Sequence, residues 1–91
     1  MPENNAAVLY LQTAGERYTP QEVAQLTLLK AFADATGWDL QSAVVEPETA
    51  SERPQWKWVR ESFETGKIQA VIMWDEELSH PGVWEDDLPY D

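Results

Sequence analysis

Residues 7–11, Ala-Val-Leu-Tyr-Leu, form an unbroken apolar run, and this run restricts the fold of the chain more than any other stretch. Uninterrupted runs that contain β-branched and aromatic residues are typical of strands buried on both faces, as in parallel sheets. A polar turn from Gln12 to Arg17 follows the run. The end of the first strand is where parallel α/β proteins usually place ligands and catalytic groups. We therefore predict a central strand over residues 6–11 and look for function at its end.

A helix is predicted directly after this turn. Residues 19–22, Thr-Pro-Gln-Glu, form a capping box with proline at the first helical position, and Gly37 is suited to end the helix. Helical spacing indicates a buried stripe with these members: Ala24, Leu28, Ala31 and Ala35, widened by Leu29 and Phe32. Trp38 then leads into a second strand over residues 40–45.

The same alternation continues in the second half of the chain. A polar loop over residues 47–53 precedes a predicted helix over residues 54–65, with Trp56, Val59 and Phe63 facing inward and Gly66 as its terminator. Residues 68–74 form another apolar run and are predicted as the third strand. The Pro81-Gly82 pair and Pro89 predict irregular structure after Trp74. The order β-α-β-α-β predicts a small three-layer α/β domain with a short parallel sheet of strand order 2-1-3.

Composition places this domain in a class. The 91 residues predict one domain over 1–91, with residues 1–5 frayed and residues 75–91 forming an acidic C-terminal segment. The chain has no cysteine, hence no disulfide and no thiol nucleophile. No secretion signal is visible, and no apolar stretch approaches the roughly 20 residues that cross a membrane. We therefore expect a soluble, cytoplasmic protein without membrane association.

Charge is the strongest compositional signal. Seventeen acidic residues against six basic ones give a net charge of −11, and residues 75–91 hold seven acids and no Lys or Arg. Non-specific binding to nucleic acid depends on Lys and Arg that neutralise phosphates. Direct nucleic-acid binding is therefore not expected, whereas a protein partner with a basic surface is. A highly acidic composition can also mean only solubility.

Several segments in the same order resemble the N-terminal catalytic domain of serine recombinases, the resolvase/invertase group. The segments are AVLYLQTA, then Gln25 with LLKAFADATGWDL, then ERPQWKWVRESFETGK, and finally IQAVIMWDEELSH. Together they span about residues 6–80, although no single motif is highly specific. The resemblance implies a resolvase-like, flavodoxin-like fold, truncated to about the first half of that catalytic domain.

The resemblance also implies where an active site would lie, and the catalytic residues are missing there. In the family, the first strand ends in Y-x-R-V-S, where the serine attacks a DNA phosphodiester and the arginine steadies the phosphate. Gln12 stands at the arginine position here, and Ala14 stands at the serine position. Thr13 lies beside the serine position, but its side chain should point to the other face of the strand.

The third strand of the family is followed by D-R-L-S-R, which supplies two further arginines. Here the corresponding residues are Glu76-Glu77-Leu78-Ser79-His80, so that Glu77 reverses one positive charge and His80 replaces the other. Gln25 and Arg53 do match active-site positions of the family. Phosphoryl transfer needs a nucleophile and cations where charge develops. We therefore predict that the chain is not an enzyme and has no cofactor and no metal.

The acidic side chains support two interpretations. Glu46, Glu48, Asp75, Glu76 and Glu77 should gather at the C-terminal edge of the sheet. Such oxygen clusters can hold Mg²⁺ or Ca²⁺, which leaves a metal-dependent hydrolase as an alternative function. The favoured interpretation is a solvated acidic rim, with His80 exposed beside it and without a catalytic role.

The five tryptophans suggest an interaction surface. Trp58 lies about 200° around the second helix from Trp56 and should face outward, and Trp84 lies in the acidic segment. A short sheet also has open edges, where exposed aromatic residues favour a protein partner or self-association. Alternatively, Trp84 and Leu88 fold back over the sheet.

Together these features predict a non-catalytic protein that acts by protein binding, in its sharper form as an acidic DNA mimic that regulates a recombinase or another nucleic-acid-binding protein. The predicted partner-binding residues are Trp58, Trp84, Asp75, Glu76, Glu77, Glu85, Asp86 and Asp87. A homodimer and a small oligomeric structural protein remain alternatives.

Overall fold

A computed structural model describes residues 5–88 as one mixed sheet with a helix on each face. The elements in chain order are β1 (Ala6–Thr13), α1 (Pro20–Ala35), β2 (Asp39–Pro47), α2 (Pro54–Glu64), β3 (Ala70–Asp75) and β4 (His80–Trp84). The sheet order is β2-β1-β3-β4. β1 pairs in parallel with β2 and β3, and β4 is antiparallel to β3. The α/β class is therefore confirmed.

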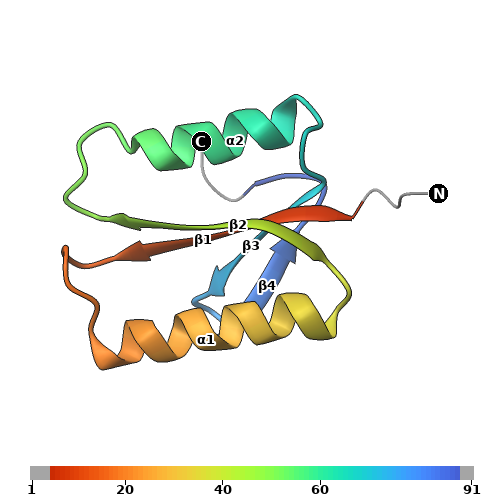
Figure 1. The fold of residues 1–91 in the computed structure, drawn as a ribbon. Coiled ribbons are helices and arrows are strands. Elements are labelled where there is room, and N and C mark those ends of the chain that lie inside the picture. Colours follow the sequence, from red (N-terminus) through yellow and green to blue (C-terminus); the bar gives the residue numbers. More distant parts are fainter. Residues whose placement is uncertain (1–4, 89–91) are drawn as a thin grey trace.

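Two apolar clusters hold the layers together, one on each face of the sheet. Ala7, Leu9 and Leu11 of β1 pack with Leu29 and Ala33 of α1. On the other face, alternate β1 residues pack with α2, in a cluster that includes Val8, Tyr10, Trp56 and Val59. Figure 1 shows α1 and α2 on opposite sides of the sheet accordingly. β1 is buried on both faces, as its apolar run predicts.

The prediction of irregular structure after Trp74 is wrong. β4 covers residues 80–84, and Pro81 pairs with Trp74 and Gly82 with Met73. Proline is tolerated in an edge strand because one side of such a strand needs no N–H donor. Trp84 and Leu88 pack against the cluster on the α2 face. The segment therefore folds back on the sheet, whereas Pro89 lies outside the described residues.

The predicted buried stripe of α1 is confirmed for Leu29 and Phe32 but wrong for its other four members. Ala24, Leu28, Ala31 and Ala35 are exposed, while Leu29 and Ala33 are buried. Leu26 and Phe32 pack against the same cluster as Leu29 and Ala33. Because apolar residues occur on more than one side of this helix, two faces fit the helical period. The face that turns inward carries the larger side chains and so buries more apolar area.

The ends of the chain were predicted as an N-terminal frayed segment and an acidic C-terminal segment. Asn5 is bonded to the fold, since its carbonyl accepts from the Asp39 backbone N at 2.9 Å and its side chain donates to the Gly37 carbonyl at 3.0 Å. Residues 1–4 and 89–91 lie outside the described residues.

Candidate functional site

A small cleft lies where the carboxyl ends of β1 and β3 meet. The chain leaves β1 through α1 on one face to reach β2, and it returns through α2 on the other face to reach β3. The connections therefore diverge between β1 and β3, and such a divergence is where open α/β sheets bind ligands. The cleft has a volume of about 140 Å³. It is lined by Tyr10, Leu11, Gln12, Gln25, Glu48, Met73, Trp74 and Glu76.

Besides the aromatic residues Tyr10 and Trp74, the polar side chains of this cleft are two amides and two carboxylates. Gln12 comes from the end of β1, Gln25 from α1, Glu48 from just after β2 and Glu76 from just after β3. Within residues 5–88, no Lys, Arg or His lines the cleft. Drug-sized ligands occupy pockets of roughly 300–1,000 Å³, so this cleft has room for a small group such as the head of one side chain. Its charge favours a cation that donates hydrogen bonds.

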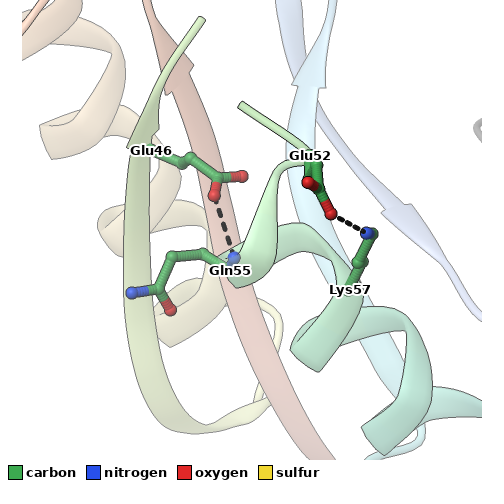
Figure 2. Close-up of polar contacts among 4 residues, drawn as sticks. All are labelled: Glu46, Glu52, Gln55 and Lys57. Atoms are coloured by element: carbon green, nitrogen blue, oxygen red, sulfur yellow. Dashed lines mark hydrogen bonds and ion pairs between the residues drawn. The ribbon is translucent and has the colours of Figure 1, made fainter. Parts of the chain in front are cut away.

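A buried polar network lies beside the cleft, on the α2 side of the sheet. Glu46 of β2 has only 1% of its surface exposed. Its carboxylate accepts hydrogen bonds from the Tyr10 hydroxyl at 2.7 Å and from the Gln55 and Trp56 backbone N atoms at 2.8 and 3.2 Å. Figure 2 shows Glu46 reaching the first turn of α2. A carboxylate at this place satisfies N–H groups that a helix start leaves without partners.

Arg53 completes the network. Its guanidinium donates to the Tyr10 hydroxyl at 3.2 Å and lies 5.9 Å from the centre of the Tyr10 ring and 5.5 Å from that of Trp56. Burial, and to a smaller extent the Glu46 carboxylate, raise the pKa of Tyr10 to about 12, although Arg53 acts in the opposite direction. The phenol therefore stays protonated at neutral pH and holds a fixed wall of the cleft.

The start of α2 explains why a distant carboxylate is needed. Arg53 occupies the N-cap position with φ 48° and ψ 63°, and its side chain makes no capping bond. Glu52 also has positive φ, at 64°. Pro54 supplies the fixed φ of the first helical residue. The exposed ion pair between Glu52 and Lys57, at 3.6 Å, spans this same turn (Figure 2).

The structure brings some of the sequence-predicted site residues together and separates others. Gln12, Gln25 and Glu76 share the cleft. Arg53 belongs to the neighbouring network instead. Ala14 and Glu77 are exposed and are not among the lining residues.

Ala14 lies in the turn after β1, and a residue of α1, Glu22, forms hydrogen bonds with this turn. The Ala14 backbone N donates to Glu22 Oε2 at 2.8 Å, while the Thr19 backbone N donates to Glu22 Oε1 at 2.8 Å. These bonds from the Thr19 and Ala14 backbones lower the pKa of Glu22. Thr13 is buried, and its hydroxyl donates to the Gly15 carbonyl at 2.8 Å. The burial of Thr13 between exposed Gln12 and Ala14 agrees with the predicted alternation of side chains along the strand.

The turn from β3 to β4 carries Glu76, Glu77 and His80. The Glu77 and Leu78 backbone N atoms both donate to Asp75 Oδ1, at 3.0 and 3.3 Å, which closes the turn. The His80 ring meets the Phe32 ring edge-on, with centroids 5.7 Å apart. His80 thus lies on the α1 side of the turn and outside the lining of the cleft.

Some of the predicted partner-binding residues are exposed, and others are partly buried. Trp58 is 47% exposed, as its place on α2 predicts. Trp84 is half-buried against the cluster on the α2 face, so it does not form part of an open surface. Glu85, Asp86 and Asp87 are exposed.

The prediction that five carboxylates gather at the edge of the sheet is wrong for Glu46. This residue is buried and accepts hydrogen bonds from the first backbone N–H groups of α2. Within the described part of the chain, no three His, Asp or Glu side chains come together in a way that could hold a metal ion. Glu48 and Glu76 do line the same cleft.

Two features of the site were not found from the sequence. One is Tyr10, whose hydroxyl links Glu46 to Arg53. The other is the buried role of Glu46, for which one signal exists. The predicted start of α2 at Pro54 has no Ser, Thr, Asp or Asn before it, so another group must accept from its first N–H groups.

No protein-family model matches the chain, and neither curated proteins nor solved structures provide a match. The resemblance to serine recombinases therefore stays a prediction from the sequence. Within residues 5–88, neither helix has the length and apolar character needed to cross a membrane.

Proposed function

We propose that this chain is a non-catalytic binding protein whose cleft receives a positively charged side chain from a basic protein partner. The observation that carries the proposal is the lining of the cleft. Glu48 and Glu76 face a small space that the amides of Gln12 and Gln25 also line. A guanidinium or ammonium group fits such a space in size, charge and hydrogen bonding.

The resemblance to serine recombinases adds to this proposal. In that family the corresponding region binds a phosphate with arginines, whereas this chain carries Gln12 and Glu77 at two of the arginine positions and Ala14 at the nucleophile position. A resolvase-like fold with negative charge at this place would bind the cationic groups that normally bind phosphates. The natural partner is then a nucleic-acid-binding protein, such as a recombinase, whose basic surface otherwise contacts DNA.

The acidic segment adds a second group of carboxylates at the opposite end of the sheet, because β4 runs antiparallel to β3 and Trp84 pairs with Val71. Glu85, Asp86 and Asp87 are exposed and follow β4 directly. A partner with an extended basic surface would contact both groups in place of phosphates, Glu76 and Glu77 beside the cleft and these three residues at the other end of the sheet. Such a mimic occupies the DNA-binding surface of its partner and should compete with DNA for it.

Calorimetric titration with a capped tetra-arginine peptide tests the cleft at low and high salt. We expect saturable binding at 20 mM NaCl that weakens at least about tenfold at 500 mM NaCl, because exposed charges are screened. The double variant Glu48→Gln/Glu76→Gln should weaken binding about tenfold at low salt. The matched control is Glu61→Gln/Glu64→Gln, which removes two exposed carboxylates from α2 and should have little effect.

Two results would contradict the proposal. One is equal affinity of the double variant and the control, which would mean that the net negative charge of the protein, and not the cleft, attracts the peptide. The other is the absence of binding at millimolar peptide. Heat released with Mg²⁺ or Ca²⁺, lost in the double variant, would instead support the metal-dependent alternative.

A further inference from the structure

The outer edge of β2 forms the floor of a second, larger groove. β2 is the terminal strand of the sheet next to β1, so half of its backbone N–H and C=O groups face away from any other strand. The groove has a volume of about 570 Å³ and is lined by Tyr18, Ser42, Ala43, Val44, Val45, Gln55 and Trp58. Figure 1 shows β2 running between the layers of α1 and α2.

Two aromatic side chains form the walls of this groove. Tyr18 comes from the turn before α1 and is 48% exposed, and Trp58 comes from α2 and is 47% exposed. They therefore approach the strand edge from the two helix layers. Large aromatic side chains with accessible faces, beside unpaired backbone groups, are what a protein uses to take up an extended peptide as an added strand.

The charges around the groove indicate the chemistry of the occupant. Within residues 5–88, the lining contains no charged side chain. Asp39 is the first residue of β2, and Glu48 directly follows its last residue, and both are exposed. A segment lying along the edge would thus pass an uncharged middle and a carboxylate at each end.

We propose that β2 binds an extended segment of a partner protein as a fifth strand, with an apolar or aromatic middle and a Lys or Arg near each end. β2 has nine residues, which corresponds to about 26 Å between its first and last Cα atoms at roughly 3.3 Å per residue. The two basic residues of the segment should therefore stand about eight or nine positions apart. Main-chain hydrogen bonds would supply affinity, and Tyr18 and Trp58 would select the middle of the segment.

A second copy of this chain fits the same edge less well. Antiparallel pairing of two β2 strands about Ala43 would place Asp39 of one copy opposite Pro47 of the other and next to its Glu48. The carboxylates would then meet at both ends of the new ladder, and like charges across strands are destabilising. The net charge of −11 on each copy opposes such pairing further.

This binding mode does not require the cleft between β1 and β3. Glu48 lines the cleft and directly follows β2, but none of the residues Gln12, Gln25, Glu48 and Glu76 lines the groove. The variant Glu76→Lys should therefore abolish binding of the arginine peptide and leave binding at β2 unchanged. Failure of one proposal is in this way distinguishable from failure of the other.

The probe is a capped nine-residue peptide with Lys at both ends and alternating Val and Thr between them, followed by NMR of the backbone amides. We expect saturable shift changes concentrated in residues 39–47 and at the Trp58 indole. Trp58→Lys and Tyr18→Lys should each weaken binding at least about tenfold. Leu78→Lys is the matched control, because Leu78 is an exposed apolar residue, 72% exposed, in the turn between β3 and β4.

Two further peptides separate strand addition from simple attraction. A peptide with Glu at both ends should bind at least about tenfold more weakly. A peptide with alternate backbone amides methylated keeps its charge but cannot complete a ladder, so it should not bind. Equal binding of the methylated peptide, no binding of the Lys peptide at millimolar concentration, or protection of β2 through a homodimer seen by sedimentation would each overturn the proposal.

Discussion

At the scale of single residues, the most consequential side chain is Glu46. Removing a carboxylate from water is costly unless partners replace its hydration. Here the Tyr10 hydroxyl and two backbone N–H groups of α2 bond to it, and the Arg53 guanidinium lies on the same tyrosine. β1, β2 and the start of α2 are thereby joined at one point, next to the cleft.

Tyr10 provides a pH-dependent test of this network. Because its pKa rises from 10.0 to about 12 on folding, the native state holds the phenol proton more tightly than the unfolded chain does. The resulting stabilisation is complete below pH 10 and is lost as the pH rises from 10 toward 12. At about 1.4 kcal/mol per pKa unit, the loss is at most roughly 3 kcal/mol.

Urea unfolding between pH 8 and pH 11 measures this loss, with Tyr10→Phe as the comparison. The variant should be less stable at pH 8, because Glu46 loses a donor, and its stability should fall less steeply above pH 10. Parallel curves for the two proteins would show that Tyr10 does not titrate as proposed.

At the scale of elements, α1 shows how an apolar pattern can mislead. Leu28 and Leu29 are neighbours of the same residue type, yet Leu28 is 50% exposed and Leu29 is fully buried. The stripe of Ala24, Leu28, Ala31 and Ala35 fits the helical period as well as the buried face does. The choice depends on the sheet surface that the helix meets, which includes Leu9 and Ile72.

This pair of leucines gives a prediction with an internal control. Leu29→Ala should lower the free energy of unfolding by about 2–5 kcal/mol, because it leaves a cavity in the core. Leu28→Ala should change it by less than about 0.5 kcal/mol, as for other exposed positions. Chemical denaturation measures both. An equally large cost for Leu28→Ala would mean that its face is covered in solution.

At the scale of the whole molecule, unbalanced charge opposes the compact state. Two ion pairs are found within residues 5–88, Lys57–Glu52 at 3.6 Å and Arg60–Glu64 at 3.9 Å, and both are exposed. Exposed pairs of this kind contribute little to stability. The repulsion that results from the net charge of −11 is therefore screened mainly by solvent and counterions.

Salt should therefore stabilise the protein. Raising NaCl from 10 to 500 mM should screen repulsion on the order of 1 kcal/mol and raise Tm by roughly 4–8 °C. The double variant Asp86→Lys/Asp87→Lys replaces two negative charges by two positive ones and should show a smaller rise in the same thermal scans. A Tm that is independent of salt in the unchanged protein would contradict this view of its charge.

The sequence alone determined the order of the first five elements, the capped start of α1, the outward place of Trp58 and the face of Thr13. These features depend on short-range periodicity and capping, which neighbouring residues decide. It also located the cleft residues Gln12 and Glu76, because parallel strands bring their carboxyl ends to one edge of the sheet. Gln25 of α1 was singled out only through the resemblance to serine recombinases.

Only the tertiary structure decided the rest. β4 forms despite Pro81 and Gly82 because an edge strand needs bonds on one side alone. The buried face of α1 depends on the surface of the sheet, and the place of Glu46 depends on a helix start nine residues further along the chain. These features depend on burial and hydrogen bonding between segments that are far apart in the sequence, and a local sequence pattern carries no information about such contacts.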